Sequence, residues 1–90
     1  MAKKNYAYFF IREKPVRILV KLLDGDTHVS CLAKRVKMTY SHTSKILNLM
    51  EEAGIIEFKK NGKKRIATLT NKGKELAKTM SKALTLFSKL

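Results

Sequence analysis

Residues 30–56, with the sequence SCLAKRVKMTYSHTSKILNLMEEAGII, predict two helices separated by a very tight turn. Ser30 and Thr39 can each cap a helix N-terminus, because their hydroxyl oxygens accept a hydrogen bond from a first-turn N–H that lacks a partner in the helix. The first predicted helix covers residues 31–36 and the second covers residues 40–53. Only three residues separate the two helices, so they must pack closely against each other.

The spacing of apolar residues predicts which face of helix 40–53 is buried. Thr43, Ile46, Leu47 and Met50 follow one another at intervals of three, one and three residues, which places them on one face. The outer and flanking positions carry side chains that can donate or accept hydrogen bonds. These are Tyr40, Ser41, His42, Ser44, Lys45 and Asn48.

The next segment predicts a β-hairpin with a strongly basic tip. Residues 55–60 and 63–69 form two strands, because the pair Asn61-Gly62 between them favours the positive φ angles of a type I′ turn. Like charges on a protruding turn repel one another unless a polyanion neutralises them, so we expect the tip to contact DNA phosphates or the minor groove. The alternative is a solvated edge whose lysines prevent strands from pairing between molecules. The tip comprises Lys59, Lys60, Asn61, Gly62, Lys63, Lys64 and Arg65.

The chain before residue 30 predicts one more helix and a brief strand. Pro15 suits the first turn of a helix and Gly25 suits the position just past its end. Residues 27–29 are long enough only for a brief strand. The aromatic run 6–11 fits either a strand or a first helical turn. The apolar face of the helix comprises Val16, Leu19, Val20 and Leu23, and is widened by Ile18 and Leu22.

Residues 71–90 predict a long helix with a seam for dimerisation. Thr70 can cap its N-terminus, and its apolar residues are spaced four and three apart, as in a heptad repeat. About two heptads are too short for an isolated coiled coil but long enough when fused to a folded domain. We therefore expect a homodimer, and the alternative is that the helix folds back on its own domain. The predicted dimerisation residues are Leu76, Met80, Ala83, Leu84, Phe87 and Leu90.

Composition limits the function. The 90 residues, 44% of them hydrophobic, make one small domain, and 20 Lys and Arg against 7 Asp and Glu give a formal net charge of +13. Such an excess of positive charge favours a polyanionic partner. The longest apolar stretch is too short for a membrane span or the core of a signal peptide, so we expect a soluble cytoplasmic protein that does not bind membranes.

The order of these elements is that of a winged helix-turn-helix domain, and the residues resemble a known family. Residues 30–56 look like the helix-turn-helix segment of MarR-like and ArsR-like regulators of archaea and bacteria, and LTNKGKELA, residues 69–77, resembles the start of their C-terminal helix. Lys37 stands where the family usually has glycine, so it must tolerate a strained or left-handed backbone. The resemblance implies a mainly α fold with a small antiparallel hairpin, a core at residues 12–70 and a C-terminal dimerisation helix.

These observations predict a homodimeric, sequence-specific transcriptional regulator that binds double-stranded DNA. Helix 40–53, with its cap Thr39, would occupy the major groove, and the basic tip at residues 59–65 would contact the backbone or the minor groove. Lys34, Arg35 and Lys37 would position the DNA backbone. The alternatives are a non-specific architectural DNA-binding protein and a winged-helix module that binds RNA or protein.

The sequence predicts neither catalysis nor a cofactor. Its two histidines, one cysteine and seven acids form no recognisable catalytic arrangement. His28, Cys31 and His42 do not have the spacing of a zinc site, so no metal is expected. Cys31 lies near a predicted helix start and two cations, which would favour a reactive thiol, but a small packing residue is the simpler interpretation.

Overall fold

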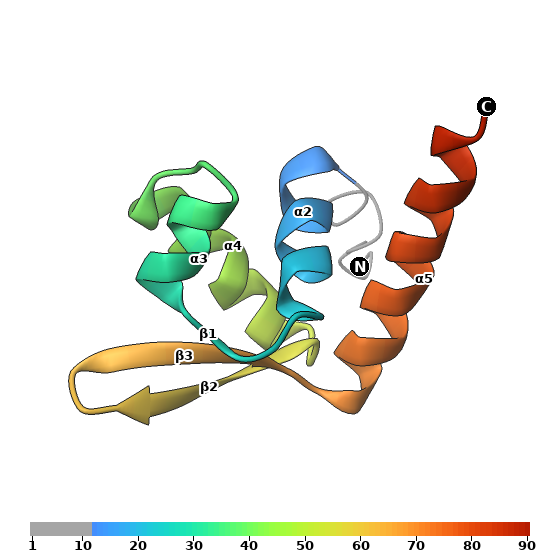
Figure 1. Cartoon of the computed structure of the whole chain (residues 1–90). Coiled ribbons are helices and arrows are strands. Elements are labelled where there is room, and N and C mark those ends of the chain that lie inside the picture. Colours follow the sequence, from blue (N-terminus) through green and yellow to red (C-terminus); the bar gives the residue numbers. More distant parts are fainter. Residues whose placement is uncertain (1–11) are drawn as a thin grey trace, which may run out of the picture.

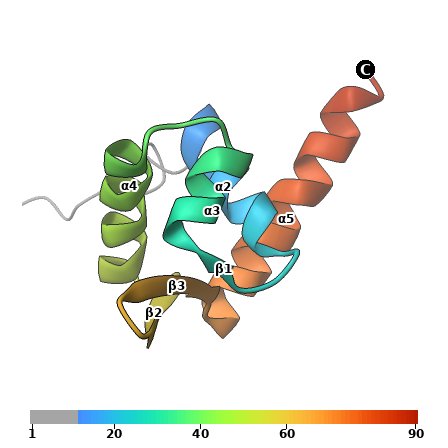
Figure 2. The same ribbon diagram turned by 60° about the vertical axis from the view of Figure 1, so that its left-hand side comes forward.

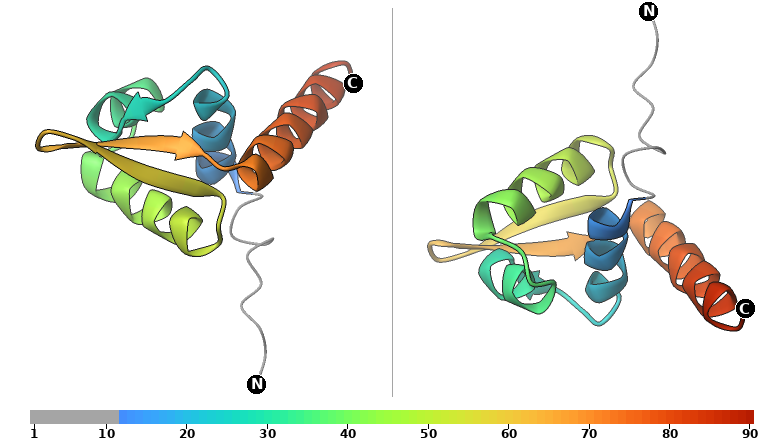
Figure 3. Two further views of the ribbon diagram at one scale, coloured as in Figure 1. Left: turned by 90° about the horizontal axis from the view of Figure 1, so that it is seen from below. Right: turned by 90° about the horizontal axis from the view of Figure 1, so that it is seen from above.

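The structure of the chain is a computed structural model that describes residues 12–90 (Figure 1). The aromatic run 6–11 lies outside these residues. Three helices cover one face of a small antiparallel sheet, and a fourth extends away from it (Figures 1 and 3). The fold is mainly helical with a hairpin, as predicted. In chain order the elements are α2 (Glu13–Leu22), β1 (Thr27–His28), α3 (Val29–Arg35), α4 (Tyr40–Glu52), β2 (Ile56–Asn61), β3 (Lys64–Leu69) and α5 (Asn71–Ser88).

The sheet has three strands in the order β1-β3-β2, so the predicted hairpin gains a third strand. The predicted turn is wrong by one residue. Asn61 pairs with Lys64 as the last pair of the hairpin, which leaves Gly62 and Lys63 as the two turn residues. Gly62 has a φ of +66° and Lys63 has no positive φ, a pattern that fits a type II′ turn rather than type I′. Pairing along the whole hairpin outweighs the local preference of Asn-Gly.

Side chains from every helix meet in one core above the sheet. The predicted inner face of α4 is confirmed, because Thr43, Ile46, Leu47 and Met50 are all buried. On α2, Pro15 lies in the first turn as predicted, but the buried face is rotated from the expected one. Val20 and Leu23 are only half-buried. The side chains that are buried on α2 are Val16, Ile18, Leu19 and Leu22.

The predicted cap of the helix before the tight turn is wrong. The N-cap position of α3 is His28, which forms no capping hydrogen bond through its side chain, and Ser30 is an exposed residue inside the helix. β1 pairs with β3 through Thr27 opposite Ala67 and His28 opposite Ile66. The helix begins directly after this pairing, so the end of the strand sets the start of α3.

The two other predicted caps are confirmed. The hydroxyl oxygen of Thr39 accepts a hydrogen bond from the backbone N–H of His42 at 3.1 Å. The hydroxyl oxygen of Thr70 accepts one from Gly73 N–H, also at 3.1 Å. The single hydroxyl hydrogen of Thr70 is in turn shared between the carbonyl oxygens of Gly54 and Ile55, which lie 2.7 and 2.9 Å from Oγ1. Thr70 therefore connects the start of α5 to the loop between α4 and β2.

α5 divides into a packed half and a projecting half. Gly73 and Ala77 are buried, and Leu76 packs against the core. Beyond residue 83 every side chain of the helix is exposed, and this half projects away from the rest of the fold (Figure 1). Among the described helices, none combines the length and the apolar character that crossing a membrane requires.

We expect Gly73→Ala to destabilise the protein, although alanine is the better helix former. A Cβ at position 73 would lie 2.0 Å from the carbonyl oxygen of Ile55, which is backbone and cannot rotate away. Overpacking of this kind lowers the free energy of unfolding by about 1–3 kcal/mol. Urea denaturation measures this change.

Lys72→Ala, at the exposed neighbouring position, is the matched control and should change the free energy of unfolding by no more than about 0.5 kcal/mol. If Gly73→Ala instead stabilised the protein by about 1 kcal/mol, as helix propensity alone would give, the close approach of α5 to residue 55 would be refuted.

Candidate nucleic-acid interface

The buried face of α4 determines which of its side chains reach solvent. One of its four buried residues, Thr43, also donates a hydrogen bond from its hydroxyl to the carbonyl oxygen of Thr39 at 2.9 Å. This bond anchors the first turn of the helix. Ser44 is half-buried at the border of this face. The side chains that the sequence assigned to DNA contact and that are exposed here are Thr39, Tyr40, Ser41, His42, Lys45 and Asn48.

The hairpin lies beside this exposed flank of α4. Figure 2 shows that the hairpin tip and α4 reach the same side of the molecule. A cation on the hairpin, Arg65, also touches α4 directly. One surface therefore presents both the polar flank of α4 and the basic tip.

The pleat of the hairpin divides its basic side chains between two faces. Arg65 lies opposite Lys60 in the ladder, and two residues further from the tip Ala67 lies opposite Phe58. Because side chains two residues apart share a face, Lys60 and Arg65 lie on the face that turns toward the core. Lys59 and Lys64 lie on the opposite face. Lys63 is exposed in the turn itself.

Arg65 joins the hairpin to α4 through two hydrogen bonds and also contacts Phe58 of its own hairpin. Its Nη2 donates to Ser44 Oγ at 2.6 Å, and its Nη1 donates to Asn48 Oδ1 at 3.3 Å. Its guanidinium carbon stands 4.5 Å from the ring centroid of Phe58, within the range of a cation–π contact. The sequence placed Arg65 among the tip cations and did not predict these contacts. Two signals were available, since Ser44 and Asn48 are four residues apart on one helix and Phe58 and Arg65 are diagonal neighbours on one strand pair.

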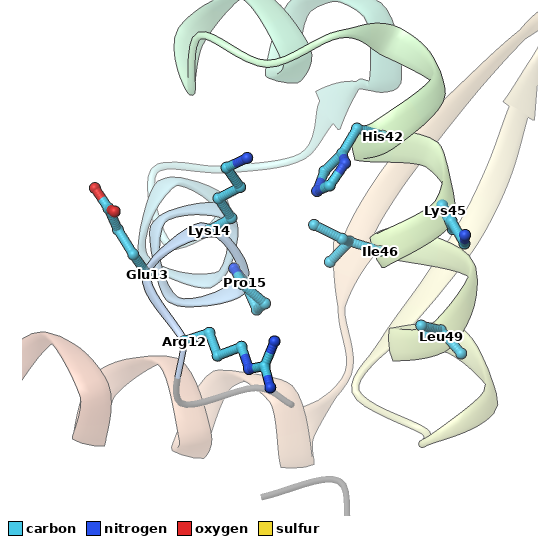
Figure 4. Close-up of a pocket in the computed structure, with 8 residues that line it drawn as sticks. All are labelled: Arg12, Glu13, Lys14, Pro15, His42, Lys45, Ile46 and Leu49. Atoms are coloured by element: carbon cyan, nitrogen blue, oxygen red, sulfur yellow. The ribbon is translucent and has the colours of Figure 1, made fainter. Parts of the chain in front are cut away.

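A hollow separates the first turns of α2 and α4 (Figure 4). Lys14 and Pro15 of α2 face His42 and Ile46 of α4 across it, whereas Lys45 points away from α2. His42 and Lys45, which the sequence placed together on the exposed flank of α4, thus point in different directions. Two further cations, Arg12 and Lys14, line the same hollow.

The turn between α3 and α4 has the backbone that the sequence required. Lys37 has a φ of +59°, in the left-handed region. The backbone N–H of Met38 donates to Ala33 C=O at 2.9 Å, so the end of α3 is closed by backbone hydrogen bonds. The guanidinium of Arg17 on α2 donates to the carbonyl oxygen of Val36 in the same turn. This turn fixes how α4 stands against α2 and α3.

The side chains considered for metal or redox chemistry are scattered. Cys31 is exposed, so it is not the packing residue that the sequence suggested. His28 is half-buried, and its Nδ1 is buried without a hydrogen-bond partner among the described residues. Within residues 12–90, no three His, Cys, Asp or Glu side chains come together as metal ligands would.

Comparisons with known proteins agree with this geometry. A family model described as winged helix-turn-helix matches residues 15–87. The structure of AF1382 from Archaeoglobus fulgidus is 25% identical, with a TM-score of 0.80 over 92% of this chain and 97% of that one. A MarR family transcriptional regulator from Silicibacter pomeroyi DSS is 26% identical, with a TM-score of 0.80 over 92% of this chain and 57% of its own. HlyU from Vibrio cholerae N16961 shares the fold at 22% identity, with a TM-score of 0.76 over 86% of this chain and 85% of its own. No curated protein matches the sequence.

We expect Lys37→Gly to be more stable than Lys37→Ala by about 1 kcal/mol, because only the Cβ of alanine is strained in the left-handed region. Both variants lose the same charge, so each serves as the control for the other. Thermal and urea denaturation measure the difference in the free energy of unfolding. Equal stability, or a more stable Lys37→Ala, would show that residue 37 does not have a positive φ.

Proposed function

The chain belongs to the winged helix-turn-helix family, and on that basis we propose that it is a sequence-specific transcriptional regulator that binds double-stranded DNA as a homodimer. In this proposal α4 enters the major groove, where Tyr40, Ser41 and Lys45 and their neighbours meet base edges. The basic hairpin contacts the phosphate backbone or the minor groove beside it.

The observation that carries the proposal is the contact between Arg65 of the hairpin and Ser44 and Asn48 of α4. It holds a basic protrusion next to a polar helix flank, so that one duplex can touch both. A basic hairpin that pointed elsewhere would leave α4 without backbone contacts beside it. Phosphate contacts hold a protein in register on DNA, and base contacts supply the specificity.

The charge of the chain supports a DNA partner. Its formal net charge is +13, and no acidic residue interrupts the tip from Lys59 to Arg65. Lys60, Lys63 and Lys64 are exposed there and available to phosphates. Because each phosphate contact releases counterions, the affinity should fall steeply with salt. Charge alone, however, equally favours a non-specific architectural protein, and the distinction rests on α4.

The projecting half of α5 supports a homodimer. Leu84, Leu86, Phe87 and Leu90 are 48%, 59%, 69% and 99% exposed. Adjoining exposed apolar side chains on one projecting helix are typical of a surface that another protein covers. Of the predicted seam, Leu76 packs against its own core, and Met80 and Ala83 are half-buried. The proposed interface therefore lies mainly beyond residue 80.

The hairpin and α4 should respond differently to mutation. We expect the double variant Lys63→Ala/Lys64→Ala to weaken binding to all duplexes about equally and to reduce the salt slope by about 2, because two phosphate contacts are lost. Lys45→Ala should lower the preference for the specific site over random duplex by about tenfold. Fluorescence anisotropy on a site selected from a random duplex pool, at several salt concentrations, measures both.

Lys82→Ala/Lys89→Ala, which removes the same charge from α5, is the control and should leave the site preference unchanged. A regulator should prefer its site at least about a thousandfold over random duplex. If the unmodified protein showed no such preference, the architectural alternative would replace this proposal, and tighter binding to structured RNA would favour the RNA-binding alternative.

The dimer should depend on the projecting half of α5. We expect Leu84→Glu/Phe87→Glu to sediment as a monomer at tens of micromolar, where the unmodified protein sediments as a dimer, because two charges would lie in an apolar contact. Lys78→Gln/Lys82→Gln changes the net charge by the same amount at two exposed positions of the helix that precede residue 84, and should remain dimeric. A monomeric unmodified protein at this concentration would contradict the homodimer.

A further inference from the structure

We propose that Arg65 is a positioning residue that orients the Asn48 amide with its NH₂ group toward DNA, so that Asn48 selects guanine rather than adenine in each half-site. This inference rests on the proposed function, because it assumes that α4 meets the base edges of the major groove. It concerns a hairpin cation that acts through α4 instead of binding a phosphate.

The geometry of Arg65 matches two acceptors one turn apart. Ser44 and Asn48 are separated by four residues, so their side chains lie above one another on the same face of α4. The guanidinium is a planar fork, and its two terminal nitrogens donate one bond each, to Ser44 Oγ at 2.6 Å and to Asn48 Oδ1 at 3.3 Å. A lysine ammonium at the same place would be a point charge and would not span both acceptors.

The hairpin holds this guanidinium in place. Phe58 lies under it at 4.5 Å from ring centroid to guanidinium carbon, and Arg65 is half-buried. Phe58 is itself held in place, because it pairs with Ala67, which is fully buried in the middle of the hairpin. Phe58 of the sheet and two side chains of α4, Ser44 and Asn48, therefore hold the guanidinium of Arg65 in one orientation. Lys60, its neighbour across the strand pair, has an exposed side chain and makes no such contact with the side chains that the structure describes.

The bond to Arg65 decides which end of the Asn48 amide faces outward. A guanidinium has only donors, so the amide oxygen, not the NH₂ group, must face it. The Nδ2 hydrogens of Asn48 are left for other partners. The hydroxyl oxygen of Ser44 likewise accepts a hydrogen bond from Arg65, and its hydroxyl hydrogen can donate to another partner.

The orientation of the Asn48 amide favours one base over another, because each base presents its own donors and acceptors in the major groove. Adenine is bound by asparagine through two bonds, one of which requires Oδ1 to accept from the adenine N6 amino group. Because Oδ1 is turned toward Arg65 and already accepts one bond from it, that pairing is weakened. Guanine offers two adjacent acceptors, N7 and O6, and suits the outward Nδ2 hydrogens. The base beneath Asn48 should therefore be guanine.

The test compares Arg65→Met with Lys60→Met in the full-length protein, using sites selected from a random duplex pool. Both variants remove one positive charge from the same face of the hairpin, and methionine keeps an unbranched apolar stem over Phe58. For Arg65→Met we expect the preference for guanine over adenine at one position of each half-site to fall by about tenfold, the size of one good base contact. Its salt slope should stay unchanged, because no phosphate contact is lost.

Lys60→Met should show the opposite pattern, with the base preference kept and the salt slope reduced by about 0.9 if Lys60 meets a phosphate. A purely structural role of Arg65 would lower the affinity for all sequences without altering the preferred base, which would overturn the inference. A salt slope reduced by about 0.9 in Arg65→Met would overturn it as well, because Arg65 would then be a phosphate contact.

A measurement without DNA separates this inference from the proposed function. In the free protein, NMR relaxation of the Asn48 side-chain NH₂ group should show an ordered amide that becomes mobile in Arg65→Met but not in Lys60→Met. An amide that is equally mobile in the unmodified protein and in Arg65→Met would refute the positioning role even if DNA binding is sequence-specific. If the amide is ordered but the protein selects no site, the proposed function fails, and the base preference fails with it.

Discussion

The burial of Thr43, Ile46, Leu47 and Met50 fixes the rotation of α4 about its axis, and the rest of the proposed interface depends on this constraint. A rotation by one residue would carry a buried side chain into solvent and a polar flank residue into the core. Because both changes are unfavourable, the core determines which side chains the helix presents. The turn at Lys37 and the bond from Arg17 to Val36 then set where that flank points relative to α2.

Local sequence signals predicted those parts of the fold that short-range chemistry controls. The caps at Thr39 and Thr70 depend on a hydroxyl and an N–H three residues apart. The left-handed backbone of Lys37 was implied by the resemblance, because the family usually has glycine at this position of the turn. The inner face of α4 follows from its spacing. The predictions that were wrong depend on partners distant in sequence. The register of β2 on β3 displaces the turn to Gly62-Lys63, and the pairing of β1 with β3 moves the start of α3 to Val29.

The candidate site shows the same division. The sequence identified the polar flank of α4 and the basic tip as separate features, because periodicity and charge can be read along the chain. It could not show that the pleat divides the lysines between two faces, or that Arg65 leaves the tip cluster to bind Ser44 and Asn48. Those facts require the register of the hairpin and its distance from α4, which long-range packing sets.

The close approach of Gly73 to the carbonyl of Ile55 couples the movement of α5 to that of the hairpin. Residue 55 leads directly into the hairpin, and Gly73 lies in the first turn of a helix whose far half projects freely. Because no side chain separates the backbones of Gly73 and Ile55, a tilt of the projecting half of α5 would also move the hairpin. In the proposed homodimer, the crossing angle of the two long helices would then set the separation of the two α4 helices.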